Sequence, residues 1–432
     1  MSRVTPTHAI ESAIERVFAP HLAPPRRVRF WRGLASRWRR TLRILWPLGG
    51  VSQGNRVRVF EDGDDLFEAM WEAILRARER IVMTTYILSP DRVGLRTLSA
   101  LEAAARRDVE VDLRYDAVGS SGLGEEWIDG LRKAGARVRA FNPIRLGLHW
   151  PIRLRLRWPI LRLRWPISRL RWRFSPLLRD HRKILVVDER VAYCGGMNVA
   201  EEYAGEKWGT GVFRDTHLEL EGPCVVDLGG LLAEGSTKPA PEAPSTDLGE
   251  ATFVQVLESD RRRNRRAIQR ALRVTLARAA ERCWLTSPYF LPPRRLRRAI
   301  TKAAARGLDV RVLTAGRSDV PLVHMASQHV YGRFLRAGVR IFEMSGRILH
   351  AKTVAIDGVY CSVGSFNLDR ISYRRNLEVN VTALDRELTA ELERQFLHDL
   401  TLSEEVTLAT WEDRTWLQRS IHWAAYHLAR LI

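Results

Sequence analysis

Five residue types that could carry chemistry occur twice in this chain of 432 residues, at the same spacing both times. The first copy begins at a histidine and continues with Lys, Asp, Gly and Asn, and the second copy repeats this order. The members are His181, Lys183, Asp188, Gly195 and Asn198 in the first copy and His350, Lys352, Asp357, Gly364 and Asn367 in the second. Because the chain has only six lysines and two of them stand at these positions, chance is a poor explanation.

This spacing suits the chemistry of a phosphodiester. Histidine and lysine two residues apart project from the same face of a strand. The aspartate follows the histidine at an odd spacing, leaves on the other face, and is expected to be a structural partner. Two such halves would surround one point with two imidazoles, two ammonium groups and an asparagine amide from each half. The cations can stabilise phosphate oxygens while one histidine attacks phosphorus and the other protonates the leaving alkoxide.

Other uses of these residues are less well supported by the pattern. No cluster of Asp, Glu and His has metal-ligand spacing, so we expect neither a metal ion nor a cofactor. Buried histidines that merely satisfy hydrogen bonds would not explain two matched His–Lys pairs. The four cysteines show no metal-like spacing, which indicates a reducing compartment. No apolar run is long enough to cross a bilayer.

The segments around the motifs alternate between strand and helix patterns. Residues 56–62, 80–88 and 109–119 have strand patterns, and residues 65–80 have a helical pattern. The same order recurs after a segment rich in Pro, Ser and Gly at 236–250. We therefore predict an α/β fold with two duplicated α-β-α halves, packed together as a pseudo-dimer with one shared active site.

The duplication also predicts the boundaries of the parts. A short amphipathic helix is expected near residues 10–18, inside a basic leader rich in Trp and Arg. The predicted parts are the leader at 1–55, the first half at 56–235 with a basic insertion at 145–179, the linker at 236–250, the second half at 251–400 and an amphipathic tail at 401–432.

The net charge of +20 is concentrated in two linear segments. Arg26–Arg43 holds eight arginines, Arg145–Arg179 holds ten, and neither contains an acidic residue. The second segment includes Trp150–Phe174, where Trp-Pro-Ile occurs three times and Arg alternates with Leu. Such segments suit an anionic membrane surface better than a nucleic-acid groove, which draws arginines from many positions. A neutral insertion in an arginine-rich chain is the alternative for 145–179.

The paired HxKxxxxD motifs with trailing GGxN and GSxN resemble the phospholipase D superfamily over roughly residues 56–400. The resemblance implies that His181 forms a covalent phosphohistidine and that His350 is the general acid and then the general base. It implies phosphate binding by Lys183, Lys352, Asn198 and Asn367, with Gly196 and Ser365 as supporting residues of the trailing motifs. A carboxylate is expected against each histidine, Glu378 in the second half and Asp215 in the first.

Within that superfamily the chain resembles bacterial cardiolipin synthases of the type that lacks amino-terminal transmembrane helices. The segments that carry this resemblance are 179–203, 213–228 and 363–380. It implies transfer of a phosphatidyl group from one phosphatidylglycerol to another through phosphohistidine, which releases glycerol. It also implies a peripheral protein on the cytoplasmic face of the bacterial inner membrane.

Contacts with that membrane are expected at 26–46, at 145–179 and at 410–432, and nucleic acid is the weaker partner. Two alternatives stay open from the sequence. One is a phosphodiesterase, nuclease or other phosphatidyltransferase that uses the same site with water or another alcohol as acceptor. The other is a catalytically silent membrane-binding protein.

Overall fold

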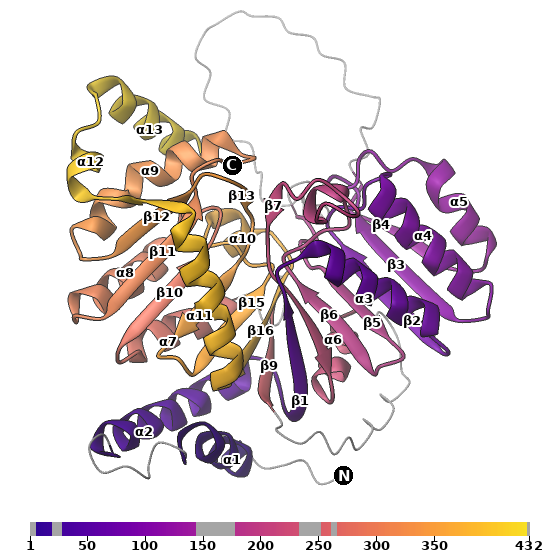
Figure 1. The fold of residues 1–432 in the computed structure, drawn as a ribbon, viewed down its shortest axis with the longest axis horizontal. Coiled ribbons are helices and arrows are strands. Elements are labelled where there is room, and N and C mark those ends of the chain that lie inside the picture. Colours follow the sequence, from indigo (N-terminus) through magenta and orange to yellow (C-terminus); the bar gives the residue numbers. More distant parts are fainter. Residues whose placement is uncertain (1–5, 20–27, 144–177, 233–251, 261–265, 430–432) are drawn as a thin grey trace, which may run out of the picture.

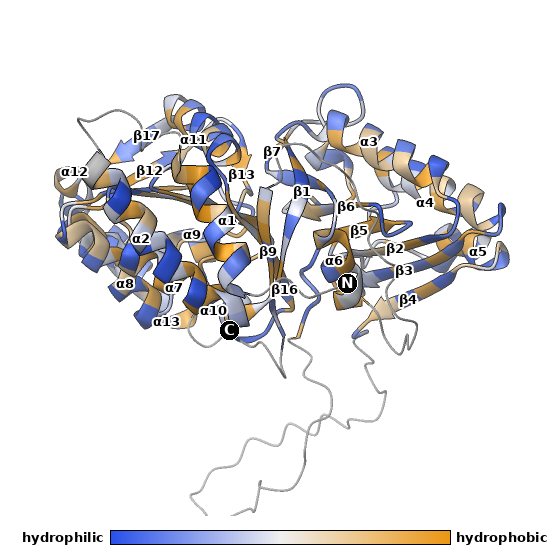
Figure 2. Cartoon of the chain, turned by 90° about the horizontal axis from the view of Figure 1, so that it is seen from below, coloured by the Kyte–Doolittle hydropathy of each residue, from blue (hydrophilic) through white to orange (hydrophobic). Residues whose placement is uncertain are grey.

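The computed structural model describes residues 6–19, 28–143, 178–232, 252–260 and 266–429. Their strands form one sheet of fifteen strands and a separate two-stranded sheet. Helices lie on both faces of the large sheet, with α3 (Gly63–Arg76) and α4 (Arg92–Ala105) on one side and α7 (Ala267–Arg278) and α8 (Arg294–Ala305) on the other (Figure 1, Figure 2). The predicted α/β class is confirmed.

The first half contributes seven strands to one side of the large sheet. From the centre outwards they are β1 (Gly50–Phe60), β8 (His217–Glu221), β6 (Val191–Gly195), β5 (Ile184–Val187), β2 (Arg80–Thr85), β3 (Glu110–Asp116) and β4 (Arg137–Phe141). Its further helices are α5 (Glu125–Lys133) and α6 (Cys224–Leu232). Strand β1 begins at Gly50 rather than near residue 56, because its first residues pair with the other half.

The second half repeats this order on the other side of the centre. From the centre outwards its strands are β9 (Thr252–Ser259), β16 (Glu378–Leu384), β15 (Tyr360–Gly364), β14 (Thr353–Ile356), β10 (Arg282–Thr286), β11 (Asp309–Ala315) and β12 (Arg340–Met344). Strands β1 and β9 pair antiparallel at the middle of the sheet. The matching strand orders confirm the predicted duplication. We propose that the halves meet within 236–250, a segment outside the described residues.

The leader differs from its prediction. Besides α1 (Pro6–Phe18), the sequence contains a second helix, α2 (Val28–Leu45), and both pack on the second half. Trp38 is only 1% exposed and stacks on Tyr360 with ring centroids 5.1 Å apart. The apolar face of this basic segment is therefore used inside the protein, and Trp38 is not available to a membrane. The predicted insertion lies almost wholly outside the described residues.

The tail begins as part of the sheet and continues as helices. Strand β17 (Ser403–Val406) pairs with β12 at the sheet edge, after helix α11 (Arg386–Thr401). Helices α12 (Leu408–Glu412) and α13 (Trp416–Leu428) then pack against α9 (Pro321–Leu335). The helices of the described residues are all too short or too polar to span a lipid bilayer.

Candidate active site

The two motif histidines lie at equivalent places, just before β5 and just before β14. The backbone N–H of His181 donates to the carbonyl of Leu377 at 3.0 Å, and that of His350 donates to the carbonyl of Arg214 at 2.8 Å. Both bonds run from one half of the chain to the other. The structure therefore brings the two motifs together at the junction of the halves.

The carboxylate partners are also exchanged between the halves. Nδ1 of His181 lies 3.1 Å from Oε2 of Glu378, and Nδ1 of His350 lies 2.6 Å from Oδ2 of Asp215. All four side chains are at most 8% exposed. Each histidine was expected to have a carboxylate from its own half, so this part of the prediction is wrong. The residues are the predicted ones, but their pairing is crossed.

Strand register explains why Asp215 and Glu378 are equivalent although their distances from the histidines differ. Gly195 pairs with His217 in the first half, and Gly364 pairs with Asn380 in the second. In each half the carboxylate stands two residues before the paired position. The longer interval in the first half lies between its last motif residue and β8, where 3₁₀ helix η3 (Glu201–Tyr203) and strand β7 (Phe213–Arg214) are located.

The residues after the motif glycines support the two carboxylates differently. A Cβ atom at Gly196 would lie 2.1 Å from Oδ1 of Asp215, so only glycine allows this carboxylate to approach. Ser365 occupies the equivalent position in the second half, and its hydroxyl donates to Glu378. The Nδ2 of Asn376 also donates to Glu378 at 3.1 Å. The first half thus holds Asp215 through the close approach that Gly196 allows, and the second half holds Glu378 through hydrogen bonds from Ser365 and Asn376.

Two buried ammonium groups stand beside the histidines. Nζ of Lys183 donates to the carbonyl of His181 at 2.9 Å, and Nζ of Lys352 lies 2.8 Å from Nδ1 of His350. Burial lowers the pKa of Lys183 to about 7, with a further contribution from the positive charge of Lys352. Burial also lowers the pKa of Lys352 to about 8. An anion placed between these groups would restore their usual charge.

The carboxylates are ionised and the imidazoles neutral at this site. Burial would raise the pKa of Asp215, but Lys352 and His350 outweigh it and hold that pKa below its usual value. Burial would also raise the pKa of Glu378, but the neighbouring His181 outweighs it and holds that pKa below its usual value. Burial and the neighbouring lysine lower the pKa of each histidine. A neutral imidazole oriented by a carboxylate can act as a nucleophile or as a base.

Asp188 and Asp357 do not join this site, although the sequence places them in the repeated motif with the catalytic residues. Asp188 accepts the backbone N–H groups of residues 78–80, at 2.8 to 2.9 Å. Asp357 accepts those of residues 280–282, at 2.9 to 3.2 Å. Both carboxylates fix the start of a neighbouring strand, β2 or β10. Their odd spacing from the histidines predicted this structural role, and their place among the catalytic residues is corrected.

The two motif asparagines are used unequally. Oδ1 of Asn198 accepts from the N–H of Ile87 at 3.2 Å, and its Nδ2 donates to the Tyr203 hydroxyl at 2.7 Å. The amide nitrogen of Asn198 has a second N–H, so its phosphate contact stays a prediction. Asn367 is 3% exposed, and its Oδ1 has no hydrogen-bond partner among the described residues. Asn367 remains a candidate for contact with substrate.

Aromatic side chains around the histidines were not predicted as part of the site. The ring of Tyr86 lies 5.0 Å from that of His181, and the rings of Tyr203 and Phe213 lie 5.4 and 5.5 Å from that of His350. Tyr86 follows a buried strand in a segment that resembles the one around Tyr289 in the second half. This similarity could have placed Tyr86 near the first histidine. Among the described residues no group of metal-ligating side chains could hold an ion.

Known proteins are similar to this chain in sequence and in fold. Residues 272–400 match a family model described as "Cardiolipin synthase, PLD-like domain". Cardiolipin synthase A of Pseudomonas aeruginosa is 34% identical over 384 residues, which are 88% of this chain and 73% of that protein. Cardiolipin synthase B of Salmonella typhi is 30% identical over 393 residues, 88% of this chain and 89% of that protein.

The chain belongs to the cardiolipin synthase family. It is therefore a phosphatidyltransferase of the phospholipase D superfamily, as the paired motifs indicated. Its fold is similar to that of phosphatidylserine synthase from Haemophilus influenzae, with a TM-score of 0.64 and 13% identity. That match covers 91% of this chain and 98% of the other, so the duplicated fold is common to both over nearly their whole length.

Proposed function

We propose that this chain transfers a phosphatidyl group from one phosphatidylglycerol to the hydroxyl of another through a phosphohistidine, giving cardiolipin and glycerol. The observation that carries the proposal is the crossed pair of buried His–carboxylate contacts beside two buried lysines. Membership of the cardiolipin synthase family supports phosphatidylglycerol as the substrate.

In the first step the phosphodiester of the donor lies between Lys183 and Lys352. Nδ1 of His181 faces Glu378, so Nε2 is the ring nitrogen left to attack phosphorus. The bond from phosphorus to nitrogen forms as the bond from phosphorus to the glycerol oxygen breaks. His350 gives its proton to that oxygen. The negative charge of the bound phosphodiester raises the pKa of His350, so that the imidazole is protonated when the leaving group needs it.

In the second step His350 acts in the opposite direction. Its neutral imidazole takes the proton of the acceptor hydroxyl, whose oxygen attacks phosphorus. The bond from phosphorus to His181 breaks, and cardiolipin forms. Asp215 orients His350 throughout and stabilises the imidazolium. The lysines hold the phosphate oxygens in both steps, and we include Asn367 as a further donor to them.

Incubation with radiolabelled phosphatidylglycerol and lipid analysis tests this proposal. From the intact chain we expect labelled cardiolipin, free glycerol and, after acid-free quenching, a labelled covalent adduct. The His181→Ala variant should give no adduct and no product. Phosphatidic acid without cardiolipin would show that water is the acceptor. Release of nucleotides from oligonucleotides without any lipid product would identify a nuclease and overturn the proposal.

We also propose that the chain works as a peripheral protein on the cytoplasmic face of the bacterial membrane. Its substrate is a membrane lipid, and the tail places apolar side chains on the surface. Trp416 is 77% exposed and Trp423 is 55% exposed. The 145–179 segment remains a proposed membrane contact on its sequence alone. Sedimentation with vesicles, with and without a deletion of Trp150–Phe174, tests that contribution. Unchanged affinity after the deletion would identify a neutral insertion.

A further inference from the structure

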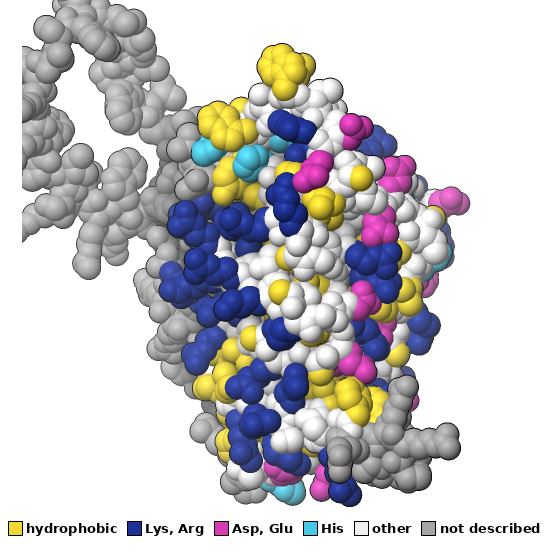
Figure 3. All heavy atoms as spheres, turned by 90° about the vertical axis from the view of Figure 1, so that its left-hand side faces the viewer, with side chains coloured by type: hydrophobic (Ala, Val, Ile, Leu, Met, Phe, Trp, Pro, Cys, Tyr) yellow, Lys and Arg dark blue, Asp and Glu magenta, His cyan; other side chains and the backbone are white. Residues whose placement is uncertain are grey.

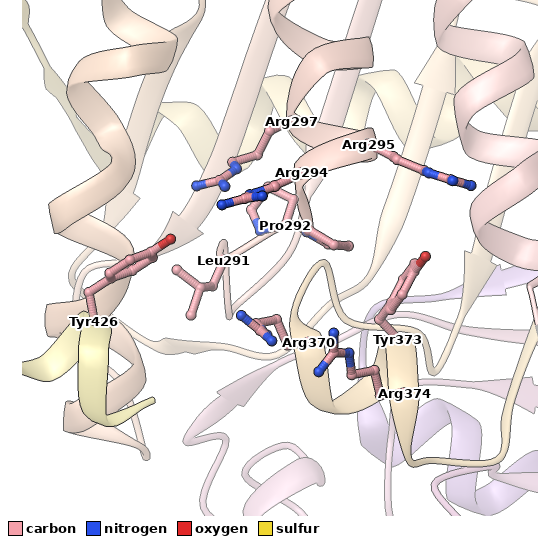
Figure 4. Close-up of a pocket in the computed structure, with 10 residues that line it drawn as sticks. Leu291, Pro292, Arg294, Arg295, Arg297, Arg370, Tyr373, Arg374 and Tyr426 are labelled. Carbon is pink, nitrogen blue, oxygen red and sulfur yellow. The ribbon is translucent and has the colours of Figure 1, made fainter. Parts of the chain in front are cut away.

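A cavity of about 290 Å³ opens on the second half, and neither of the paired histidines is among the described residues that line it. Five arginines line it: Arg294, Arg295 and Arg297 from the start of α8, and Arg370 and Arg374 from helix α10 (Arg370–Arg374). Figure 4 shows the two groups of guanidinium side chains on opposite sides of the cavity, with Leu291 between them. No acidic residue is among the described residues that line it.

Three arginines of this pocket, from both of its helices, carry a charge that no described acidic residue pairs with. Within the part of the chain that the structure describes, Arg294, Arg295 and Arg374 have no ion-pair partner, and all three are exposed. Nε of Arg297 is buried, and no described residue accepts its hydrogen bond. A buried donor of this kind is costly unless something accepts its hydrogen bond. The first turn of α8 has no acidic residue, so its helix dipole adds to the positive potential.

Apolar surface lies next to this positive pocket. Tyr426 of α13 forms one wall, while the outer face of the same helix exposes Trp416, Leu417 and Trp423 by 53% or more. Figure 3 shows apolar side chains at one end of this side of the molecule and a column of Lys and Arg side chains below them. Tryptophan beside arginine suits the headgroup level of a lipid bilayer.

We infer that this pocket binds the phosphate group of an anionic phospholipid in the membrane surface, as a second lipid site beside the catalytic one. Guanidinium groups from two helices can chelate one phosphate from opposite sides. The exposed tryptophans of α13 enter the headgroup layer next to it. The inference rests on the membrane association proposed above. A nucleic acid could bind the arginines, but the apolar outer face of α13 would then stay exposed to water.

The position of the pocket connects it to the active site. Helix α10 begins three residues after Asn367, and the N–H of Leu291 donates to the carbonyl of Leu368 at 3.0 Å. A lipid held by the α8 and α10 arginines therefore holds the loop that carries the second motif against the bilayer.

Flotation with phosphatidylcholine vesicles, with and without phosphatidic acid, tests this site. Phosphatidic acid presents a phosphate without a headgroup alcohol that could leave, so binding is separated from turnover. We expect the Arg294→Gln, Arg295→Gln, Arg374→Gln triple variant to bind the anionic vesicles at least tenfold more weakly than the intact chain. Turnover of a soluble short-chain phosphatidylglycerol should stay unchanged, which also shows that the variant folds.

A matched control removes three exposed arginines from the first half, in the Arg58→Gln, Arg78→Gln, Arg190→Gln variant. It has the same net charge as the pocket variant and should keep its vesicle affinity. Equal losses in both variants would mean general attraction by charge and would overturn the pocket. The proposed lipid site would also be overturned if the pocket variant kept its vesicle affinity and lost only its binding of inorganic phosphate or of an oligonucleotide. If the intact chain does not bind anionic vesicles at all, the proposed membrane association fails first.

Discussion

The crossed carboxylates make the Glu378→Gln substitution informative, because it should affect a histidine in the other half of the chain. The variant keeps the size of the side chain and removes its charge. Glu378 accepts from Nδ1 of His181 at 3.1 Å, and both side chains are buried. A hydrogen bond to a charged group contributes about 1.5–3 kcal/mol. Since about 1.36 kcal/mol corresponds to a tenfold change in rate, formation of the phosphohistidine should slow by about 10- to 150-fold.

Rapid quenching of a single turnover with labelled phosphatidylglycerol measures this step directly. The companion variant, Asp215→Asn, removes the charge beside His350 and should slow the same step by a similar factor. A substrate with a better leaving group distinguishes the two variants. A phosphatidyl ester of p-nitrophenol needs no protonation of its leaving oxygen, so this substrate should rescue formation of the adduct in Asp215→Asn and not in Glu378→Gln.

Rescue of Glu378→Gln alone would mean that His350 is the nucleophile and that the proposed order is reversed. Rescue of neither variant would refute the assignment of a general acid to this pair. Imidazole N–H resonances in NMR spectra provide an independent control. Loss of the His181 resonance in Asp215→Asn, in place of Glu378→Gln, would contradict the crossed pairing itself.

Three further predictions follow from the surroundings of the site. With pKa values of about 7 and about 8, Lys183 and Lys352 lose their charge as the pH rises, so kcat/KM for a soluble phosphatidylglycerol should fall between pH 7 and 8. A decline that begins only near the usual lysine pKa would contradict the argument that burial lowers these pKa values. Gly196→Ala should act like Asp215→Asn in the leaving-group test, since the added methyl group pushes the carboxylate from His350; normal activity would exclude the close approach. Trp38→Ala should destabilise the fold by about 3–5 kcal/mol in denaturant unfolding and leave vesicle affinity unchanged; the opposite pattern would restore a membrane role for α2.

The duplicated fold could be predicted from the sequence because two motifs with equal offsets were embedded in the same alternation of strands and helices. The sites of His181 and His350 followed from that repeat. The crossed pairing could not be predicted, because the sequence gives the order of strands along the chain but not which half crosses the junction. Strand register, through the pairs Gly195–His217 and Gly364–Asn380, was needed to place the carboxylates.

The leader shows a different limit. Its arginines suggested a membrane segment, but a helix with apolar residues on one side and arginines on the other can also dock on a protein. Helix α2 buries Leu34, Trp38 and Leu42 against the second half and leaves Arg32, Arg40 and Arg43 exposed. Composition alone could not separate these two outcomes, since both require the same amphipathic pattern. The arginine pocket was missed because its residues come from two helices about seventy residues apart in the chain.

The reciprocal contacts at the junction have the form of a two-fold dimer interface built into one polypeptide. Asp180 of the first half forms a β-bridge with Leu377 of the second, and Leu349 of the second half pairs with Arg214 of the first. Each half therefore supports the other through the same kind of backbone pairing. Two identical subunits would have to change together at every such position. A single chain has no such constraint, and here one half uses Gly196 with Asp215 while the other uses Ser365 with Glu378. A single chain can thus keep the symmetry that brings the two histidines together and still give each its own surroundings, as the proposed division between attack and proton transfer requires.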